Sequence, residues 1–128
     1  KEEVGKLLKE HKSGNLRFKG NLENYKEIMQ SFEFIKIFDG WIPDRFVEIQ
    51  TEKFSLVNID VDLYQPTLDS LKFFYPRLIS GGIIYIDDYS RPYWPGADKA
   101  VLEFLETISN AEYHFIKIPL GGAIIQKL

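Results

Sequence analysis

Two pairs of aspartates follow two apolar segments of this sequence. The segment FSLVNI is followed by Asp60, with Asp62 two residues later, and the segment IIYI is followed by Asp87 and Asp88. Ionised carboxylates are costly to bury unless they take up a proton, pair with a basic side chain or bind a metal ion. The two pairs therefore indicate a site in which one of these three outcomes is realised.

The residues between the two pairs predict where the aspartates lie. Residues 54–60 and 83–87 are typical of buried strands, and residues 66–78 have the apolar spacing of a helix that begins at Pro66. A right-handed crossover makes two such parallel strands neighbours, with their carboxyl ends at the same edge of the sheet. We therefore expect the two aspartate pairs to lie close together, where open α/β sheets bind their ligands.

The donor atoms of such a cluster favour a hard cation. Mg²⁺ takes oxygen ligands in octahedral geometry and keeps some of its waters. Zn²⁺ is less suited, because the chain has no cysteine and neither stretch offers a histidine. The alternative is structural, since aspartates often cap turns and helix starts, and Asp60 or Asp88 could serve only that purpose. Tyr64 and Tyr89, which follow the pairs, could line a pocket or belong to the edge of the core.

The rest of the chain predicts an α/β fold. Gly81-Gly82 would end the helix 66–78, and the short PLGG connection predicts a closing hairpin. Strands that alternate with helices indicate a mostly parallel sheet covered on both faces. The remaining expected elements are helices at 1–15 and 21–32, a strand at 32–38, a connection at 40–53 with a short helix near Pro43, a helix at 97–109, and strands at 112–118 and 122–128.

Composition narrows the classes of partner. The chain has 128 residues and a net charge of −3 without a basic block, so we expect neither nucleic acid nor an anionic membrane as partner. No apolar run approaches the roughly 20 residues that span a bilayer. The absence of cysteine fits a reducing, cytoplasmic location.

A series of short motifs in fixed order occupies residues 54–105. These are DVDLY at 60–64, PT at 66–67, YPRL at 75–78, GG at 81–82, DDY at 87–89, PGA at 95–97 and KAV at 99–101. In order and spacing they resemble the macrocin O-methyltransferase (TylF) family of class I S-adenosylmethionine-dependent methyltransferases, and FDGWIPDRF extends the resemblance back to about residue 34. The resemblance implies a Rossmann-like sheet and methyl transfer to a hydroxyl of a sugar or natural-product-like small molecule.

The resemblance also implies roles for six residues. Mg²⁺ would be bound by Asp60, Asp87 and Asp88, and Asp62 would be the general base that takes the proton of the acceptor hydroxyl. Gly40 and Trp41 would contact the adenine of S-adenosylmethionine, and Asp60 is also counted among the cofactor-binding residues.

Two features of a complete class I domain are missing from the sequence. None of the nine glycines forms the G-x-G turn after a first strand, and no acidic residue ends a second strand to hold the ribose. With Lys1 at its start and Met29 as its one methionine, the chain resembles the C-terminal portion of the domain, without the first two strands. We expect residues 1–128 to form a single partial domain with open sheet edges and weak cofactor binding. Such edges favour a homodimer, or a rearranged sheet in which strand 34–38 lies beside strand 54–60.

Three other interpretations remain open at this point. A metal-dependent glycosyltransferase uses D-x-D to hold a nucleotide sugar, although this does not explain the second pair. Haloacid-dehalogenase phosphatases use D-x-D-x-T, but Tyr64 stands in place of the threonine. The third is a non-catalytic remnant that associates through its open sheet edges.

Overall fold

The computed structural model describes residues 26, 28–29 and 32–128. The chain divides into two units, residues 1–39 and residues 40–128, and all described strands belong to the second. The helix predicted at 1–15 lies outside the described residues, as does most of the helix predicted at 21–32, of which residues 26, 28 and 29 are helical. The prediction of a single partial domain stays a prediction.

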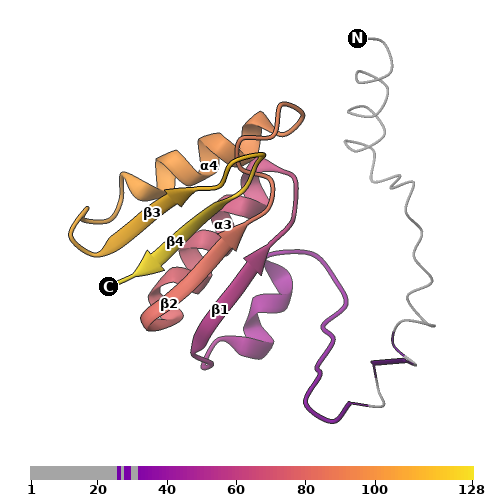
Figure 1. Ribbon diagram of the computed structural model, residues 1–128. Helices are drawn as coiled ribbons and strands as arrows, with labels where there is room; N and C mark the ends of the chain where they lie inside the picture. The colour runs from indigo at the N-terminus through magenta and orange to yellow at the C-terminus, as the bar shows by residue number, and fades with distance from the viewer. Residues whose placement is uncertain (1–25, 27, 30–31) are drawn as a thin grey trace, which may run out of the picture. The chain divides into compact units, whose positions relative to one another are not determined.

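Four strands form one sheet in the order β1-β2-β4-β3 (Figure 1). They are β1 (Phe54–Ile59), β2 (Leu78–Ile86), β3 (Tyr113–Lys117) and β4 (Ala123–Lys127). β1 and β2 are parallel neighbours, whereas β4 is antiparallel to both β2 and β3. The α/β class, the crossover and the closing hairpin are thus confirmed, but the sheet of the described residues is mixed rather than mostly parallel.

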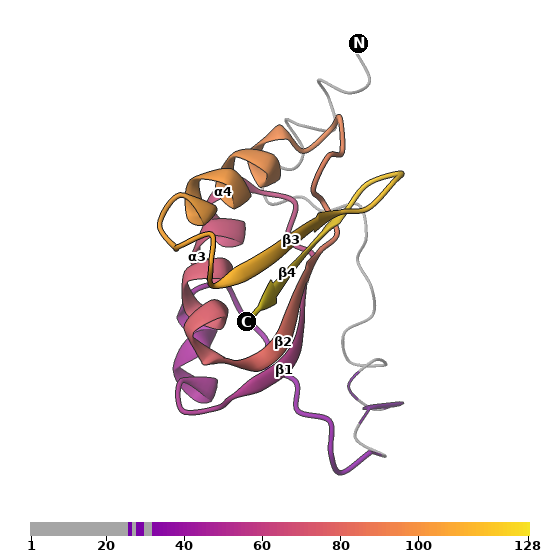
Figure 2. The same ribbon diagram turned by 60° about the vertical axis from the view of Figure 1, so that its left-hand side comes forward.

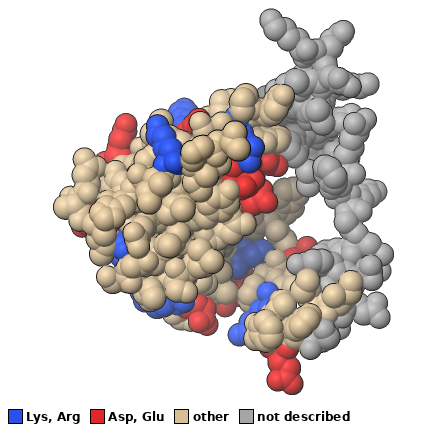
Figure 3. All heavy atoms as spheres, in the orientation of Figure 1, with Lys and Arg blue, Asp and Glu red and all other residues tan. Residues whose placement is uncertain are grey.

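Both long helices pack against the same face of the sheet. Figures 1 and 2 together show α3 (Tyr64–Phe74) and α4 (Pro95–Leu105) on one side of the four strands. The core between them is formed by Val57, Ile59, Leu68, Leu71, Ile84, Ile86, Ala100, Val101, Phe104, Ala123 and Ile125. The expectation of a sheet covered on both faces is therefore wrong for the described elements. Leu56, on the other face, is 66% exposed, and Figure 3 shows that this face is largely uncharged.

An aromatic cluster holds the connection before β1 against α3. The predicted short helix is present as η1 (Asp44–Ile49), and its Phe46 ring stacks on Phe73 with centroids 4.3 Å apart. The guanidinium of Arg77 lies 3.9 Å from the Phe73 centroid and donates to the Gln50 carbonyl at 2.9 Å. This cluster fixes the start of the βαβ unit that carries the aspartates.

Two predicted elements differ from the structure. Residues 32–38 form no strand, and none of the four described strands pairs with them, so the rearranged sheet is not found among the described strands. α3 ends at Phe74, and a single turn, η2 (Tyr75–Arg77), leads into β2, which contains the Gly81-Gly82 pair. A Cβ at Gly82 would lie 2.9 Å from the Ile79 carbonyl oxygen, so glycine permits a close approach where the register of β1 and β2 shifts.

Candidate functional site

The carboxyl ends of β1 and β2 bring the two aspartate pairs to one edge of the sheet. Ile59 and Ile86 are register partners at the last residues of the two strands, and the Asp87 N–H donates to the Ile59 carbonyl at 3.0 Å. Asp60 therefore follows β1 at the place where Asp87 and Asp88 follow β2. The sequence-based expectation that both pairs lie at one edge is confirmed.

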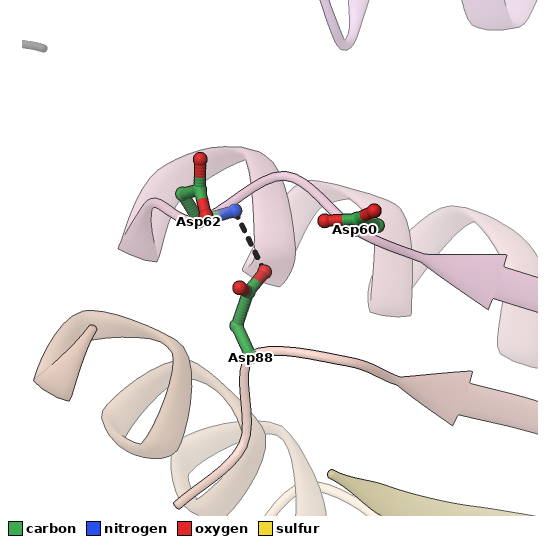
Figure 4. A group of neighbouring side chains, drawn as sticks. All are labelled: Asp60, Asp62 and Asp88. Atoms are coloured by element: carbon green, nitrogen blue, oxygen red, sulfur yellow. Dashed lines mark hydrogen bonds between the residues drawn. The ribbon is translucent and has the colours of Figure 1, made fainter. Parts of the chain in front are cut away.

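Three of the four aspartates form a compact group. One carboxylate oxygen from each of Asp60, Asp62 and Asp88 lies within 4.8 Å of the others, which is close enough for the three to share a cation. Figure 4 shows Asp60 at the end of β1, Asp62 in the following turn and Asp88 reaching up from the end of β2. Asp88 is buried, with 4% of its surface exposed, Asp62 is half-buried and Asp60 is exposed.

Asp88 also holds the turn that carries Asp62. Its Oδ2 accepts a hydrogen bond from the backbone N–H of Asp62 at 2.8 Å and a longer one from Val61 at 3.3 Å (Figure 4). The turn is closed by the Leu63 N–H, which donates to the Val61 carbonyl at 2.6 Å. Asp62 lies at its centre with φ of 59°, a left-handed conformation that aspartate tolerates better than most residues with a Cβ.

The helix after this turn is fixed against α4. α3 begins at Tyr64, and the Leu63 carbonyl accepts hydrogen bonds from both the N–H and the hydroxyl of Thr67, at 3.1 and 2.7 Å. A Cβ at Gly96 would lie 3.1 Å from the Tyr64 backbone nitrogen, so glycine lets α4 approach α3 closely. The Tyr64 hydroxyl donates to Glu103 at 2.6 Å. These contacts limit the movement of the Asp62 turn from the helix side.

The electrostatics of the group favour neutralisation. Burial raises the pKa of Asp88, and the nearby Asp62 carboxylate raises it further, although the N–H groups of Asp62 and Val61 oppose the shift. Burial also raises the pKa of Asp60, with smaller contributions from Asp88 and Asp87. The ion pairs among the described residues are Lys26–Asp39 and Arg45–Glu48, so no described basic side chain pairs with Asp60 or Asp88. Of the three outcomes named for buried carboxylates, proton uptake and cation binding therefore remain for Asp60 and Asp88.

Asp87 lies beside the group rather than within it. Its Oδ1 accepts a hydrogen bond from the Tyr85 hydroxyl at 3.0 Å, and Asp62 takes the third place among the clustered carboxylates. The assignment of Asp87 as a metal ligand and of Asp62 as the base stays a prediction. Tyr85 was not singled out from the sequence, although strand alternation places residue 85 on the same face as residue 87 and could have indicated it.

Gly40 and Trp41 precede η1 and do not follow a strand. The Trp41 side chain is 74% exposed, and its carbonyl accepts a hydrogen bond from the Arg45 N–H at 3.2 Å. Gly40 has φ of 148°, and a Cβ there would lie 2.5 Å from the Arg45 Cδ, so the position requires glycine. An exposed indole can stack on a base, but the adenine-binding role of both residues stays a prediction.

The two tyrosines that follow the aspartate pairs belong to the packed structure. Tyr89 is 4% exposed and packs edge-to-face against Phe115 with centroids 5.4 Å apart. Tyr64 is half-buried, with its hydroxyl on Glu103 and the Lys99 ammonium 5.1 Å from its ring centroid. Of the two sequence interpretations, these contacts favour the edge of the core.

Comparison with known proteins agrees with this arrangement. Residues 15–124 match the Macrocin-O-methyltransferase (TylF) family over most of the chain. The chain belongs to the macrocin O-methyltransferase (TylF) family. The resemblance seen in the sequence is thereby confirmed, and the glycosyltransferase and phosphatase interpretations are set aside.

The curated relatives of this TylF-family chain are named as O-methyltransferases. It is 33% identical over 72 residues to the 8-demethyl-8-(2,3-dimethoxy-alpha-L-rhamnosyl)-tetracenomycin-C 4'-O-methyltransferase of Streptomyces olivaceus, which covers 56% of this chain and 26% of that protein. It is 36% identical over 58 residues to the mycinamicin III 3''-O-methyltransferase of Micromonospora griseorubida, covering 45% and 23%. The chain thus matches about a quarter of each relative.

Solved structures share the fold. The O-methyltransferase NovP aligns with a TM-score of 0.61 at 25% identity, over 82% of this chain and 44% of NovP. CalS11, a TDP-rhamnose 3'-O-methyltransferase of calicheamicin biosynthesis, aligns with a TM-score of 0.53 at 26% identity, over 66% of this chain and 36% of that one. The Rossmann-like class is therefore confirmed. No helix in the described part of the chain is long and apolar enough to cross a membrane.

Proposed function

We propose that this chain carries the cation-binding and proton-accepting part of an S-adenosylmethionine- and Mg²⁺-dependent O-methyltransferase. The acceptor would be a hydroxyl of a sugar or of a similar natural product, as in the names of the relatives. The observation that carries the proposal is the convergence of Asp60, Asp62 and Asp88 within 4.8 Å at the carboxyl edge of the sheet. Family membership supplies the reaction class.

The donor set suits the proposed cation. It consists of carboxylate oxygens, which Mg²⁺ prefers, and at least two of the carboxyls have raised pKa values that a bound cation would offset. By the roles that the family resemblance implies, Asp60 and Asp88 of this group and the neighbouring Asp87 would hold the ion, which leaves Asp62 as the base. A coordinated hydroxyl loses its proton more readily than a free one. Asp88 has a second task, because its Oδ2 holds the backbone of the Asp62 turn.

Asp62 would then accept the proton of the acceptor hydroxyl. Its turn is fixed on one side by Asp88 and on the other by the start of α3, so the carboxylate is presented from a rigid backbone. The sulfonium methyl of the cofactor is already activated, and the protein mainly has to align the hydroxyl oxygen with the methyl carbon and sulfur. Gly40 and Trp41 would contribute to the cofactor site. We further propose that the protein works as a homodimer, because the edges of β1 and β3 are unpaired among the described strands.

A cation titration tests the proposal on the protein itself. Mn²⁺ is a suitable probe because it accepts the same carboxylate ligands as Mg²⁺ and can be followed by electron paramagnetic resonance. We expect the 128-residue chain to bind one Mn²⁺ ion and Asp60→Asn to weaken that binding at least about tenfold. Asp69→Asn is the matched control, because Asp69 lies in α3, accepts a hydrogen bond from Gln65 at 2.9 Å and is outside the group. Equal affinity of the chain and Asp60→Asn would rule out the metal site.

A further inference from the structure

Tyr85 points along β2 toward the aspartates. Its neighbours Ile84 and Ile86 are buried at 0% and 1% exposure against the helices, so strand alternation places Tyr85 on the opposite, helix-free face. On that face the side chain two residues further along is Asp87. The Tyr85 hydroxyl reaches it and donates to Oδ1 at 3.0 Å.

The β3–β4 hairpin fixes the end of the tyrosine ring. A Cβ at Gly122 would lie 2.9 Å from the Tyr85 hydroxyl oxygen, so the glycine leaves the space that this hydroxyl occupies. The Gly122 N–H donates to the Tyr89 carbonyl at 2.6 Å, which ties the hairpin to the segment after β2. Tyr85 is also flanked in the sheet by Asn58 on β1 and Ile124 on β4. The hydroxyl thus lies between the Asp87 carboxylate and the backbone at Gly122.

Asp87 links this tyrosine to the clustered carboxylates. The Asp87 N–H donates to the carbonyl of Ile59, the residue before Asp60, at 3.0 Å, and the Asp87 carboxylate accepts the hydrogen bond from Tyr85. Asp87 thus joins Tyr85 to the end of β1 from which Asp60 follows. A donor on one carboxylate oxygen restricts rotation of the group, which is how carboxylates at metal sites are commonly oriented.

We propose that Tyr85 is a positioning residue of the cation site, acting by holding the Asp87 carboxylate beside Asp60. The inference rests on the proposed function, because it takes Asp87 to be a ligand of the bound cation. Tyr85 itself does not touch the ion. The hydroxyl proton stays bonded to the tyrosine oxygen and forms the hydrogen bond to Asp87 Oδ1. Gly122 leaves free the space that the Tyr85 hydroxyl occupies.

Loss of the hydroxyl should weaken cation binding. Tyr85→Phe keeps the ring and its packing and removes the donor to Asp87, and we expect the Mn²⁺ affinity of the 128-residue chain to fall about tenfold. Tyr113→Phe is the matched control, because its hydroxyl donates to Asn110 at 2.9 Å from the start of β3, at the opposite end of the sheet. It should bind Mn²⁺ like the unchanged chain. Circular dichroism of each variant shows that the fold is retained.

A double-mutant cycle separates positioning from a general effect on the sheet. If Tyr85 acts through Asp87, Asp87→Asn should weaken Mn²⁺ binding, and adding Tyr85→Phe should weaken it no further. An unchanged affinity of Tyr85→Phe would overturn the inference, and so would equal losses in Tyr113→Phe or an independent loss on top of Asp87→Asn. Failure of the unchanged chain to bind Mn²⁺ would instead remove the metal site of the proposed function, and the inference with it.

Discussion

Replacement of Asp88 by alanine removes the oxygen that accepts hydrogen bonds from Val61 and Asp62. A hydrogen bond to a charged acceptor contributes about 1.5–3 kcal/mol, and the 2.8 Å bond from Asp62 is the stronger of the two. The change also removes a buried charge close to Asp62, which offsets part of the loss. We expect the free energy of unfolding to fall by roughly 2–3 kcal/mol, whereas Asp88→Asn, which keeps an acceptor oxygen, should change it by less than about 1 kcal/mol.

Urea unfolding followed by circular dichroism measures this difference. The titrations are done at neutral pH with a chelator, because a bound cation would itself stabilise the folded chain. Asp87→Ala is the control, since its carboxylate accepts from the Tyr85 hydroxyl rather than from the backbone of the Asp62 turn. Equal destabilisation by asparagine and alanine at residue 88 would refute the reasoning, because it would show that the charge and not the acceptor oxygen holds the turn.

Three further predictions concern the chemistry. In an enzyme whose donor-binding part is intact, Asp62→Asn should abolish methyl transfer and leave S-adenosylmethionine affinity nearly unchanged; an active variant would remove Asp62 as the base. Calorimetric titration of residues 1–128 with S-adenosylmethionine should show weak or absent binding, because the sequence has no G-x-G turn, and micromolar binding would contradict this. Mn²⁺ affinity should be full well above the pKa values of Asp60 and Asp88, which are raised above the ordinary value of aspartate, and should fall as the pH drops toward them and protons compete for the oxygens; a flat profile would contradict this.

The βαβ unit was predictable because several signals agree within it. Apolar runs of strand length flank a helical stripe that starts at Pro66, and the crossover rule then fixes the edge at which both aspartate pairs lie. The site's location needed no knowledge of side-chain rotamers. It followed from where two strands end.

The sequence-based predictions were wrong or incomplete where the structure depends on a neighbouring strand or on local backbone geometry. Residues 32–38 alternate like a strand, but a strand forms only when it pairs with a neighbour, and these residues pair with none of the described strands. Gly81-Gly82 is a common helix terminator in sequence, yet here both glycines lie within β2, where Gly81 has φ of 77° and a Cβ at Gly82 would lie 2.9 Å from the Ile79 carbonyl oxygen of the same strand. The grouping of Asp62 with Asp60 and Asp88, and of Asp87 with Tyr85, depends on a left-handed turn and on one hydroxyl. The left-handed turn cannot be read from residue types, whereas strand alternation places residues 85 and 87 on one face and could have indicated the second pairing.

The left-handed backbone at Asp62 restricts which residues can evolve at that position. A residue with a Cβ holds such a conformation at a cost on the order of 1–2 kcal/mol, with glycine exempt and asparagine and aspartate less affected. That cost falls on the folding equilibrium, so in its proposed role as base the Asp62 carboxylate would need no rearrangement in each turnover. Glycine and asparagine satisfy the backbone but cannot accept a proton, and glutamate accepts a proton but strains the turn. Aspartate meets both requirements of the proposed role, so we expect residue 62 to tolerate fewer substitutions than its half-buried surface would suggest.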